Sequence, residues 1–383
     1  MAICSDLDET PSADAYFSIA TFLNTHGNTP IGRGVGLEVG NTIYFNMPKD
    51  QFAYWNTDDI SRTKIHRLIR SGHIDCLHSF GDLATTREDA KLSLMALERH
   101  GCRLSVWIDH AQARTNLGRD IMQGYGDLTD DPAYHADLTL GHGVRYVSMG
   151  RVTSLIGQGT RYRPLDIFDL KRPVSSGRSL LKDVAKYALA GRNDGKYRLH
   201  AQNRVMRETQ LRDGQGIVEF MRCNPHPQGV SCGDNSIGMG EVLTDRYLSK
   251  LINCGGSAVI YTHLGKKLRP KDYFSTKTRT AFERLASYSG DGRILVTTTR
   301  RLLGFKEAAS KVSGRIVDRR DQRCVELKVP DGCDESGITF YWDGELPKVL
   351  VNGTERQDIQ VNPVDETGRA SVGIRWNKLE WGL

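Results

Sequence analysis

The sequence predicts an α/β fold, and three observations favour this class. First, short apolar runs such as residues 2–4, 74–77 and 103–108 alternate with amphipathic helical segments, which is typical of parallel strands joined by crossover helices. Second, roughly seven or eight such units follow one another, which indicates a closed or nearly closed, deformed (β/α) barrel. Third, after about residue 311 the pattern changes to short strands separated by turns, which indicates a small antiparallel β domain.

The expected strands of the barrel are short runs of apolar and β-branched residues that end in polar turns. The stretch 35–47 differs, because its alternating pattern and its glycines suggest an extra strand pair or an excursion. The other strands are expected at residues 2–4, 18–23, 74–77, 103–108, 144–149, 216–222, 257–262 and 294–297.

The expected helices repeat apolar residues every three or four positions. In the stretch 59–71, Ile65 and Leu68 share one face, and Gly72 ends the helix. The stretch 132–141 has proline near its start and glycine at its end, as helices often do. The remaining helices are expected at residues 86–100, 178–190, 241–253 and 272–288.

Two domains are expected, the barrel over residues 1–310 and a small β-sandwich-like domain over residues 311–383. Turn pairs such as Asp343-Gly344 and Asn352-Gly353 separate the short strands of the second domain. The aromatic residues of this domain can form either a sugar-stacking face or the domain's own core. Its strands are expected at residues 323–329, 337–342, 348–351, 358–361 and 370–376.

Composition and charge exclude several classes of protein. The chain has 383 residues and a net charge of only +6, with both signs interspersed, so no nucleic-acid partner is expected. No apolar run reaches the roughly 18 residues that a membrane span needs, and the first residues, MAICSDLDET, do not resemble a signal peptide. Eight cysteines without any CxxC pair predict reduced thiols in a cytoplasmic protein.

Polar side chains follow the apolar strands, where the active sites of (β/α) barrels lie. His78 and Asp82 are four residues apart, so on a helical turn both side chains reach one metal ion. Imidazole and carboxylate ligands suit zinc or a similar divalent ion. The plain alternative is a surface turn that happens to contain both residue types. The other polar residues that follow strands are Asp6, Asp8, His26, Asp109, His110, Arg222 and His263.

Three motifs occur in a characteristic order. The first motif is Ser5-Asp6-Leu7-Asp8, which is followed after a gap by Ala20-Thr21-Phe22. The second is the stretch 66–82, with the sequence HRLIRSGHIDCLHSFGD, and the third is Tyr261-Thr262-His263. This order resembles the polysaccharide deacetylase superfamily (carbohydrate esterase family 4), whose members are metal-dependent, deformed (β/α) barrels. The resemblance covers roughly residues 1–300, is poor over about 150–215, and does not include the C-terminal domain.

The resemblance implies a role for each matched residue. Asp8, His78 and Asp82 would bind a divalent metal ion, by preference zinc. Asp6 would be the general base and His263 the general acid of a hydrolase that removes an N- or O-acyl group, such as acetyl, from a carbohydrate or glycoconjugate. The residues expected to contact the substrate are His26, Asp109, His110, Asn116 and Arg222.

Two departures from the family leave alternatives open. Asp82 stands where the family has a second metal-binding histidine. Leu7 separates the two aspartates, which are usually adjacent, so the roles of Asp6 and Asp8 can be exchanged. The same barrel can host a glycoside hydrolase that uses Asp6 and Asp109 as its two carboxylates. It can also bind carbohydrate or a partner protein without turnover. A purely structural alternative is that Asp6 and Asp8 cap a turn and that His263 is a hydrogen-bonded core histidine.

Overall fold

The computed structural model describes residues 1–161, 163–191, 195–266, 273–319, 322–330, 333–365 and 367–383. They divide into two units. The first is Met1–Arg300 together with Leu379–Leu383, and the second is Arg301–Lys378. The second unit is therefore an insertion, because the chain returns to the first unit for its last five residues. Within the described part of the chain, every helix is too short or too polar to span a bilayer.

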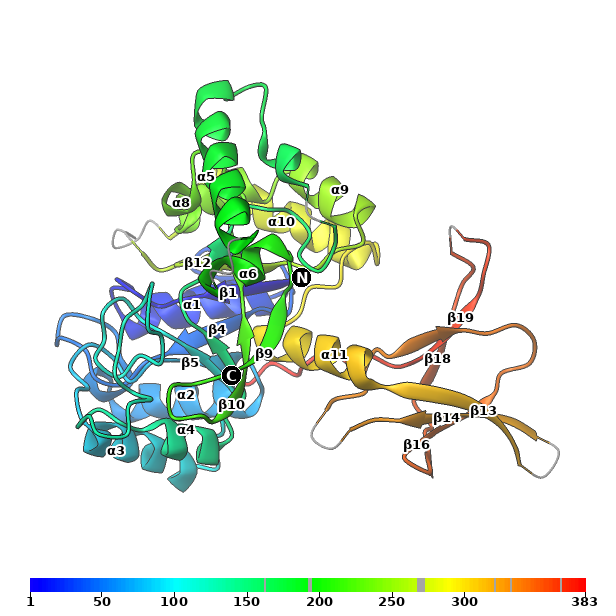
Figure 1. The fold of residues 1–383 in the computed structure, drawn as a ribbon, viewed down its shortest axis with the longest axis horizontal. Helices are drawn as coiled ribbons and strands as arrows, with labels where there is room; N and C mark the ends of the chain where they lie inside the picture. Colours follow the sequence, from blue (N-terminus) through cyan, green and yellow to red (C-terminus); the bar gives the residue numbers. More distant parts are fainter. Residues whose placement is uncertain (162, 192–194, 267–272, 320–321, 331–332, 366) are drawn as a thin grey trace. The chain divides into compact units, whose positions relative to one another are not determined.

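The first unit is built on a ten-stranded sheet, in which all pairings are parallel except that of β9 with β10. Figure 1 shows β12, β1, β4 and β5 as neighbours near the middle of this sheet. The order across the sheet is β8 (Val152–Thr153), β11 (Arg222–Cys223), β12 (Val259–Thr262), β1 (Ala2–Ser5), β4 (Gly40–Ile43), β5 (Ile74–His78), β6 (Val106–Ile108), β7 (Tyr146–Ser148), β10 (Gly216–Phe220) and β9 (Met206–Gln210).

The sheet curls, because strands near its two ends are consecutive pieces of chain. Only Met221 separates Phe220, the last residue of β10, from Arg222, the first residue of β11. β10 pairs with β7, whereas β11 pairs with β8 and β12 at the other end of the order. The two ends of the sheet must therefore approach each other. This curled, mostly parallel sheet with its helices confirms the predicted α/β class.

Helices connect successive strands, and local sequence explains where they begin. The side chains of Ser12, Asp58 and Thr86 accept hydrogen bonds from backbone N–H groups in the first turns of α1, α2 and α3. The helices are α1 (Ala13–Asn24), α2 (Asp59–Arg70), α3 (Arg87–Arg99), α4 (Ala136–His142), α5 (Pro173–Gly191), α6 (Gly195–Ala201), α7 (Val230–Gly233), α8 (Ser236–Val242), α9 (Asp245–Asn253), α10 (Thr276–Gly290) and α11 (Thr299–Lys311). Short 3-10 helices lie at Tyr54–Asn56 and Pro164–Ile167, and β2 (Asn28–Thr29) pairs with β3 (Gly32–Arg33).

Two of the predicted strands are wrong. Residues 18–23 lie inside α1, where buried residues at helical spacing, including Phe22 and Leu23, face the sheet. A short apolar run fits a strand and a buried helix equally well, and here the cap at Ser12 selects the helix. Residues 294–297 contribute only an isolated bridge, between Ala2 and Thr297. The predicted start of a helix at Asp272 lies outside the described residues, and α10 begins at Thr276.

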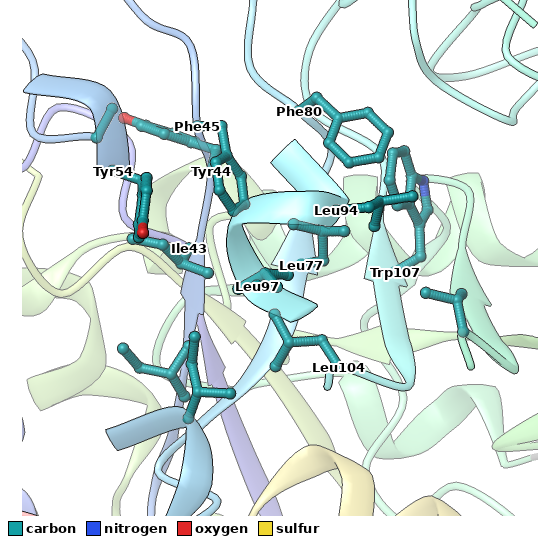
Figure 2. Close-up of a cluster of buried hydrophobic side chains, with 14 of the residues drawn as sticks. Ile43, Tyr44, Phe45, Tyr54, Leu77, Phe80, Leu94, Leu97, Leu104 and Trp107 are labelled. Atoms are coloured by element: carbon teal, nitrogen blue, oxygen red, sulfur yellow. The ribbon is translucent and has the colours of Figure 1, made fainter. Parts of the chain in front are cut away.

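A large apolar core fills the space between the strands β4, β5 and β6 and the helices beside them. Leu77 of β5 and Trp107 of β6 are fully buried and belong to the same cluster as Leu94 and Leu97 of α3 (Figure 2). Tyr44 and Phe45 extend this cluster from the end of β4. The core therefore fixes the strands whose carboxyl ends carry the candidate site.

The second unit consists of most of helix α11 and two small sheets. Its core contains Val325, Leu327, Val349 and Ile374. Most pairings are antiparallel, but β14 and β16 pair in parallel, which the turn signals do not reveal. One sheet has the order β13 (Ser313–Arg319), β14 (Gln322–Lys328), β16 (Lys348–Val351), β17 (Thr354–Glu355), and the other has the order β15 (Thr339–Tyr341), β19 (Ser371–Ile374), β18 (Ile359–Asn362).

The buried carboxyl of Asp75 should make the stability of the fold depend on pH. Burial raises the pKa of Asp75 from 3.8 to about 6, although the backbone N–H of Arg300 donates to it. The folded state then holds this proton more tightly than the unfolded state, so the contribution to stability is present below about pH 4 and is lost by about pH 6. We expect the unfolding free energy of the wild type, relative to Asp75→Asn, to fall by about 2 kcal/mol between these limits.

Urea denaturation of both proteins at pH 4 and pH 6.5 measures this difference. Asp14→Asn, at an exposed carboxylate on α1, is the control. A difference between the wild type and Asp75→Asn that stays constant with pH contradicts the prediction.

Candidate metal centre

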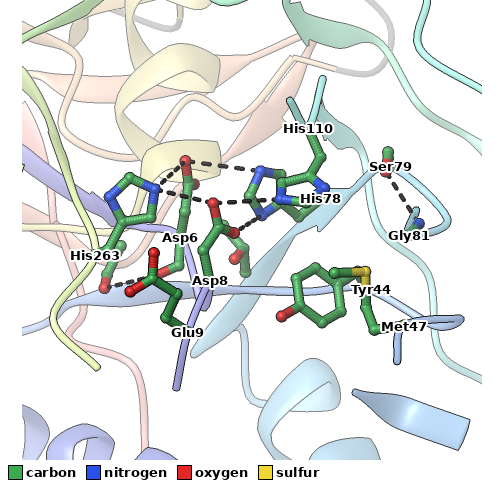
Figure 3. A network of polar contacts seen from close by, with 12 residues as sticks. Asp6, Asp8, Glu9, Tyr44, Met47, His78, Ser79, Gly81, His110 and His263 are labelled. Carbon is green, nitrogen blue, oxygen red and sulfur yellow. Dashed lines mark hydrogen bonds and ion pairs between the residues drawn. The ribbon is translucent and has the colours of Figure 1, made fainter. Parts of the chain in front are cut away.

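Separate chain segments bring charged side chains to the carboxyl ends of neighbouring strands. Asp6 and Asp8 follow β1, His78 ends β5, His110 follows β6 and His263 follows β12. These strands are parallel and lie close together in the sheet, so their ends meet at one edge. Figure 3 shows the imidazoles of His78, His110 and His263 arranged around the carboxylate of Asp8.

Asp8, His78 and His110 form a compact group in which one ligand atom from each lies within 4.8 Å of the others. Oδ1 of Asp8 is 3.3 Å from Nδ1 of His78, and Oδ2 of Asp8 is 3.3 Å from Nε2 of His110. Among the described residues, neither Oδ1 of Asp8 nor Nδ1 of His78 has a hydrogen-bond partner, although both are buried. Unsatisfied buried polar atoms are costly. A divalent ion such as zinc would satisfy both, because it accepts histidine nitrogen and carboxylate oxygen.

The electrostatics of the group suit His78 and Asp8 as metal ligands, whereas His110 has to release a proton when it binds a metal ion. Burial lowers the pKa of His78 to about 4, which favours the neutral imidazole that binds metals. Burial also opposes the charged form of His110, but Asp8 and Asp82 outweigh it and raise the pKa of His110 to about 10. Burial disfavours the carboxylate of Asp8, yet the surrounding histidines hold the pKa of Asp8 well below its usual value. Asp8 is therefore the negative centre of the group.

Each of the three candidate ligands is followed directly by a non-glycine residue in the left-handed region of backbone space. These residues are Glu9 (φ 55°), Ser79 (φ 49°) and Ala111 (φ 40°). Among the described non-glycine residues only Asn203 and Asn352 also have positive φ, and asparagine tolerates this conformation better than most residues. A left-handed non-glycine residue costs about 1–3 kcal/mol and persists only where the surroundings hold it. The three strained turns therefore mark the candidate ligands independently of their chemistry.

Asp82 does not join the ligand group, contrary to the sequence prediction. His78 is the last residue of β5, and the positive φ of Ser79 and Gly81 keeps the segment from forming a helical turn. The spacing of four residues therefore does not bring Asp82 beside His78. The carboxylate of Asp82 instead accepts a hydrogen bond from Nδ1 of His110 at 2.8 Å. It orients the ring so that Nε2 faces the group, as outer carboxylates commonly do. His110, which was expected to contact the substrate, is instead the third member of the candidate ligand group.

Asp6 lies beside the group and is held by a buried ion pair. Its Oδ2 accepts a hydrogen bond from Arg222 at 2.6 Å, and the same oxygen is 3.7 Å from Nε2 of His78. The guanidinium of Arg222 also lies over the ring of Tyr261, with 4.4 Å to the centroid. The other carboxylate oxygen of Asp6, Oδ1, is buried and has no hydrogen-bond partner in the described structure. Arg222 was expected to bind substrate, but its side chain contacts Asp6, Tyr261 and Cys4.

His263 is oriented by a loop that the sequence pattern does not identify. Its Nδ1 lies 2.8 Å from the backbone carbonyl of Asp234. A carbonyl can only accept, so Nδ1 carries a proton. Nε2 then faces Oδ2 of Asp8 at 3.1 Å. Burial lowers the pKa of His263, but Asp8 and Asp6 outweigh it and raise the pKa above its usual value. The ring is therefore arranged to carry a second proton on Nε2, toward the centre.

His26 does not line the site, contrary to the prediction. It is exposed and lies on the connection from α1 to β4. The predicted strand over residues 18–23 is part of α1, which runs back along the sheet after β1. His26 therefore follows the end of a helix and lies toward the amino ends of the strands, away from the centre.

Asp109 and Asn116 support His110 and make no contact that would bind substrate. Asp109 accepts hydrogen bonds from Nε1 of Trp107 and from the backbone N–H groups of residues 117 and 118, each at 2.8 Å. Asn116 accepts from the backbone N–H of His110 at 2.9 Å and donates to its carbonyl at 3.0 Å. Both side chains thus fix the loop that carries His110.

A cavity of about 530 Å³ opens beside the outer carboxylate of the site. It gives a bound molecule room next to the candidate ligands, with polar groups from two side chains and an aliphatic lining from the others. The residues around it are Asp82, Ala111, Gln112, Ala113, Ile121 and Met122.

Comparison of the chain with protein-family models, curated proteins and solved structures found no match. The resemblance drawn from the motifs therefore stays a prediction. The candidate site depends on the geometry of its residues.

The strained turn after His110 should affect how firmly the imidazole of His110 is positioned. Glycine adopts a positive φ freely, so Ala111→Gly should remove strain of about 1–3 kcal/mol while glycine's own flexibility costs about 0.5–1 kcal/mol. We expect the Tm of the metal-free variant to stay equal or rise. We expect its zinc affinity to fall, because a more flexible backbone at residue 111 holds His110 less firmly.

Differential scanning fluorimetry in EDTA and calorimetric zinc titration measure the two effects. Ala113→Gly is the matched control, since Ala113 lies in the same loop without a positive φ, and it should lower the Tm. If Ala111→Gly binds zinc as tightly as the wild type, the strained turn does not position His110.

Proposed function

We propose that this chain is a metal-dependent hydrolase that removes an N- or O-acyl group, such as acetyl, from a carbohydrate or glycoconjugate. One observation carries the proposal. Two further residues lie beside the group of Asp8, His78 and His110. The buried Asp6 is 3.7 Å from His78, and His263 is 3.1 Å from Asp8. A metal site with a general base and a general acid beside it is what metal-assisted hydrolysis requires.

The proposal includes a deformed (β/α) barrel of the kind that the family resemblance implies. Support comes from the single residue between β10 and β11, which links the two ends of the sheet order. β7 and β8 can be counted as one interrupted strand, and so can β10 and β11. Without the antiparallel β9, the ten strands of the sheet then form a ring of seven. The candidate ligands then stand at the mouth of that ring, where such barrels carry their active sites.

The residues present fit a bound divalent ion, and zinc suits the mixed nitrogen and oxygen donors. Such an ion supplies Lewis acidity toward a carbonyl oxygen and toward water. Asp6 accepts a proton from the attacking water through Oδ1, because Arg222 occupies the other oxygen. His263 gives the proton on its Nε2 to the departing nitrogen or oxygen. With Asp8, His78 and His110 as its protein ligands, such an ion would keep room for water and substrate, as catalytic zinc sites do.

A carbohydrate substrate follows from the motif resemblance, and the cavity beside Asp82 and Gln112 supports it with groups that hydrogen bond to hydroxyls. Glycoside hydrolysis is less well supported. It needs a second carboxylate across the pocket, and the candidate, Asp109, already accepts three hydrogen bonds from its own chain. The strained turns at the ligands favour a working site over a barrel that only binds.

A cytoplasmic location is part of the proposal. Cys4, Cys76, Cys102 and Cys223 are buried free thiols. Reduced cysteines are usual in the cytosol, whereas exported proteins tend to pair them. The thiols support this location, and cell fractionation tests it.

Substitution of the ligands and of the proton donor should have different effects. His110→Ala should lose bound zinc together with activity. His263→Ala should keep its zinc and lose roughly 100- to 10,000-fold in rate, because it removes a general acid and no ligand. Elemental analysis of the purified proteins, with acetate release from acetylated amino-sugar oligomers, measures both effects.

His26→Ala is the control for this experiment, because the side chain is exposed and distant from the centre. It should match the wild type in metal content and rate. Loss of zinc from His263→Ala would make His263 a ligand, and full activity of that variant would show that this site is not the catalytic one.

Asp82 should tune zinc affinity without being a ligand. Asp82→Asn can still accept the hydrogen bond from His110 but loses the negative charge, whereas Asp82→Ala loses both. Zinc affinity should decrease from the wild type to Asp82→Asn to Asp82→Ala, with the last about 10- to 100-fold weaker, as is typical of outer partners. Competition with a chromophoric chelator measures the three constants. A complete loss of zinc from Asp82→Asn would restore Asp82 as a direct ligand.

A further inference from the structure

Helix α5 (Pro173–Gly191) turns its polar side toward the protein. The buried residues among its described side chains are Ser176 and Asp183, which lie seven positions apart on one face. Asp183 is within 3.5 Å of Lys186. A surface helix of a globular protein normally buries its apolar face and exposes its polar face. The orientation of α5 is the reverse.

The opposite side of α5 is apolar and exposed. Val174 and Leu181, seven positions apart, are 83 % and 72 % exposed, and Val184 is 46 % exposed. The exposed Ala185 and Ala188 complete this stripe, because they follow Leu181 by four and seven positions. The same part of the chain has further large exposed apolar side chains, at Leu165, Leu170, Tyr187 and Leu189. Contiguous apolar surface of this kind marks a contact with another molecule or a membrane.

Positive charge borders the apolar stripe. Arg178 and Lys182 lie one turn apart and are exposed, and neither forms an ion pair with any residue that the structure describes. Between residues 171 and 191 there are five basic residues and a single acid, Asp183, which is buried and paired with Lys186. An anionic partner would therefore meet little like charge along this helix.

We propose that α5 docks this protein on an anionic lipid surface. A helix with an apolar face and a basic border lies in the plane of such a surface, with its apolar side chains below the headgroups. The charge disfavours a second copy of this chain as the occupant, because two α5 faces would bring Arg178 and Lys182 of each copy together. The inference goes beyond the proposed hydrolase, since no candidate ligand or proton donor lies on α5, and vesicle binding requires no turnover.

Co-sedimentation with vesicles tests the proposal. The full-length protein should bind vesicles of phosphatidylcholine with phosphatidylglycerol, and should bind pure phosphatidylcholine vesicles much more weakly. Leu181→Glu with Val184→Glu should weaken binding at least about tenfold by removing the apolar contact. Arg178→Gln with Lys182→Gln should weaken it by roughly fivefold for each charge removed, and added salt should have a smaller effect on this variant than on the wild type.

Leu346→Glu is the matched control, because Leu346 is 53 % exposed in the second unit and should leave binding unchanged. Circular dichroism of each variant confirms that the fold is kept, as expected for exposed positions. Equal binding to neutral and anionic vesicles, or no binding to either, would overturn the proposal. So would light scattering that shows a wild-type dimer which the Leu181 and Val184 substitutions dissociate.

Discussion

Asp8 carries a negative charge in a half-buried position, and three imidazoles from different strands are arranged around it. A buried charge without partners is very costly, so the surrounding fold must supply groups that compensate it. The neighbouring parallel strands do so by ending at the same edge. The group retains two buried atoms that have no hydrogen-bond partner in the described chain, and a cation held by this group could satisfy both.

His110, Asp6 and His263 each have a partner that restricts their orientation. Asp82 and Asn116 hold the ring and the backbone of His110, Arg222 holds one oxygen of Asp6, and the carbonyl of Asp234 holds His263. These contacts come from loops after different strands. A reaction that moves a proton between fixed atoms requires such positioning, because small displacements of the reacting groups are expensive in rate.

Two features of the chain depart from local conformational and packing preferences, and a function is proposed for each of them. The three left-handed residues that follow the candidate ligands are costly turns, which glycine would make without strain. Helix α5 exposes apolar residues and buries an aspartate. Natural sequences are otherwise locally consistent with their folds, so such exceptions are expected where function requires them. Elsewhere the core is ordinary, with Leu77, Trp107 and Leu94 packed between strands and helices.

The amino-acid sequence by itself determined the α/β class, because the alternation of apolar runs with amphipathic segments depends only on local periodicity. It also indicated that Asp6, Asp8, His78 and His263 lie at or just after strand ends, since strand ends are visible as the start of a polar turn. The tertiary structure decided which of these residues meet. Whether residues 18–23 form a helix or a strand depended on capping and packing, and this moved His26 away from the site.

The choice of His110 over Asp82 as the third candidate ligand depended on the backbone of Ser79 and Gly81, which spacing along the chain does not reveal. The approach of the two ends of the sheet at Met221 likewise depended on contacts between residues far apart in the sequence. Local pattern predicts where an element begins and ends, whereas the direction of a side chain after a strand is set by long-range packing and by the turn that this packing holds in place.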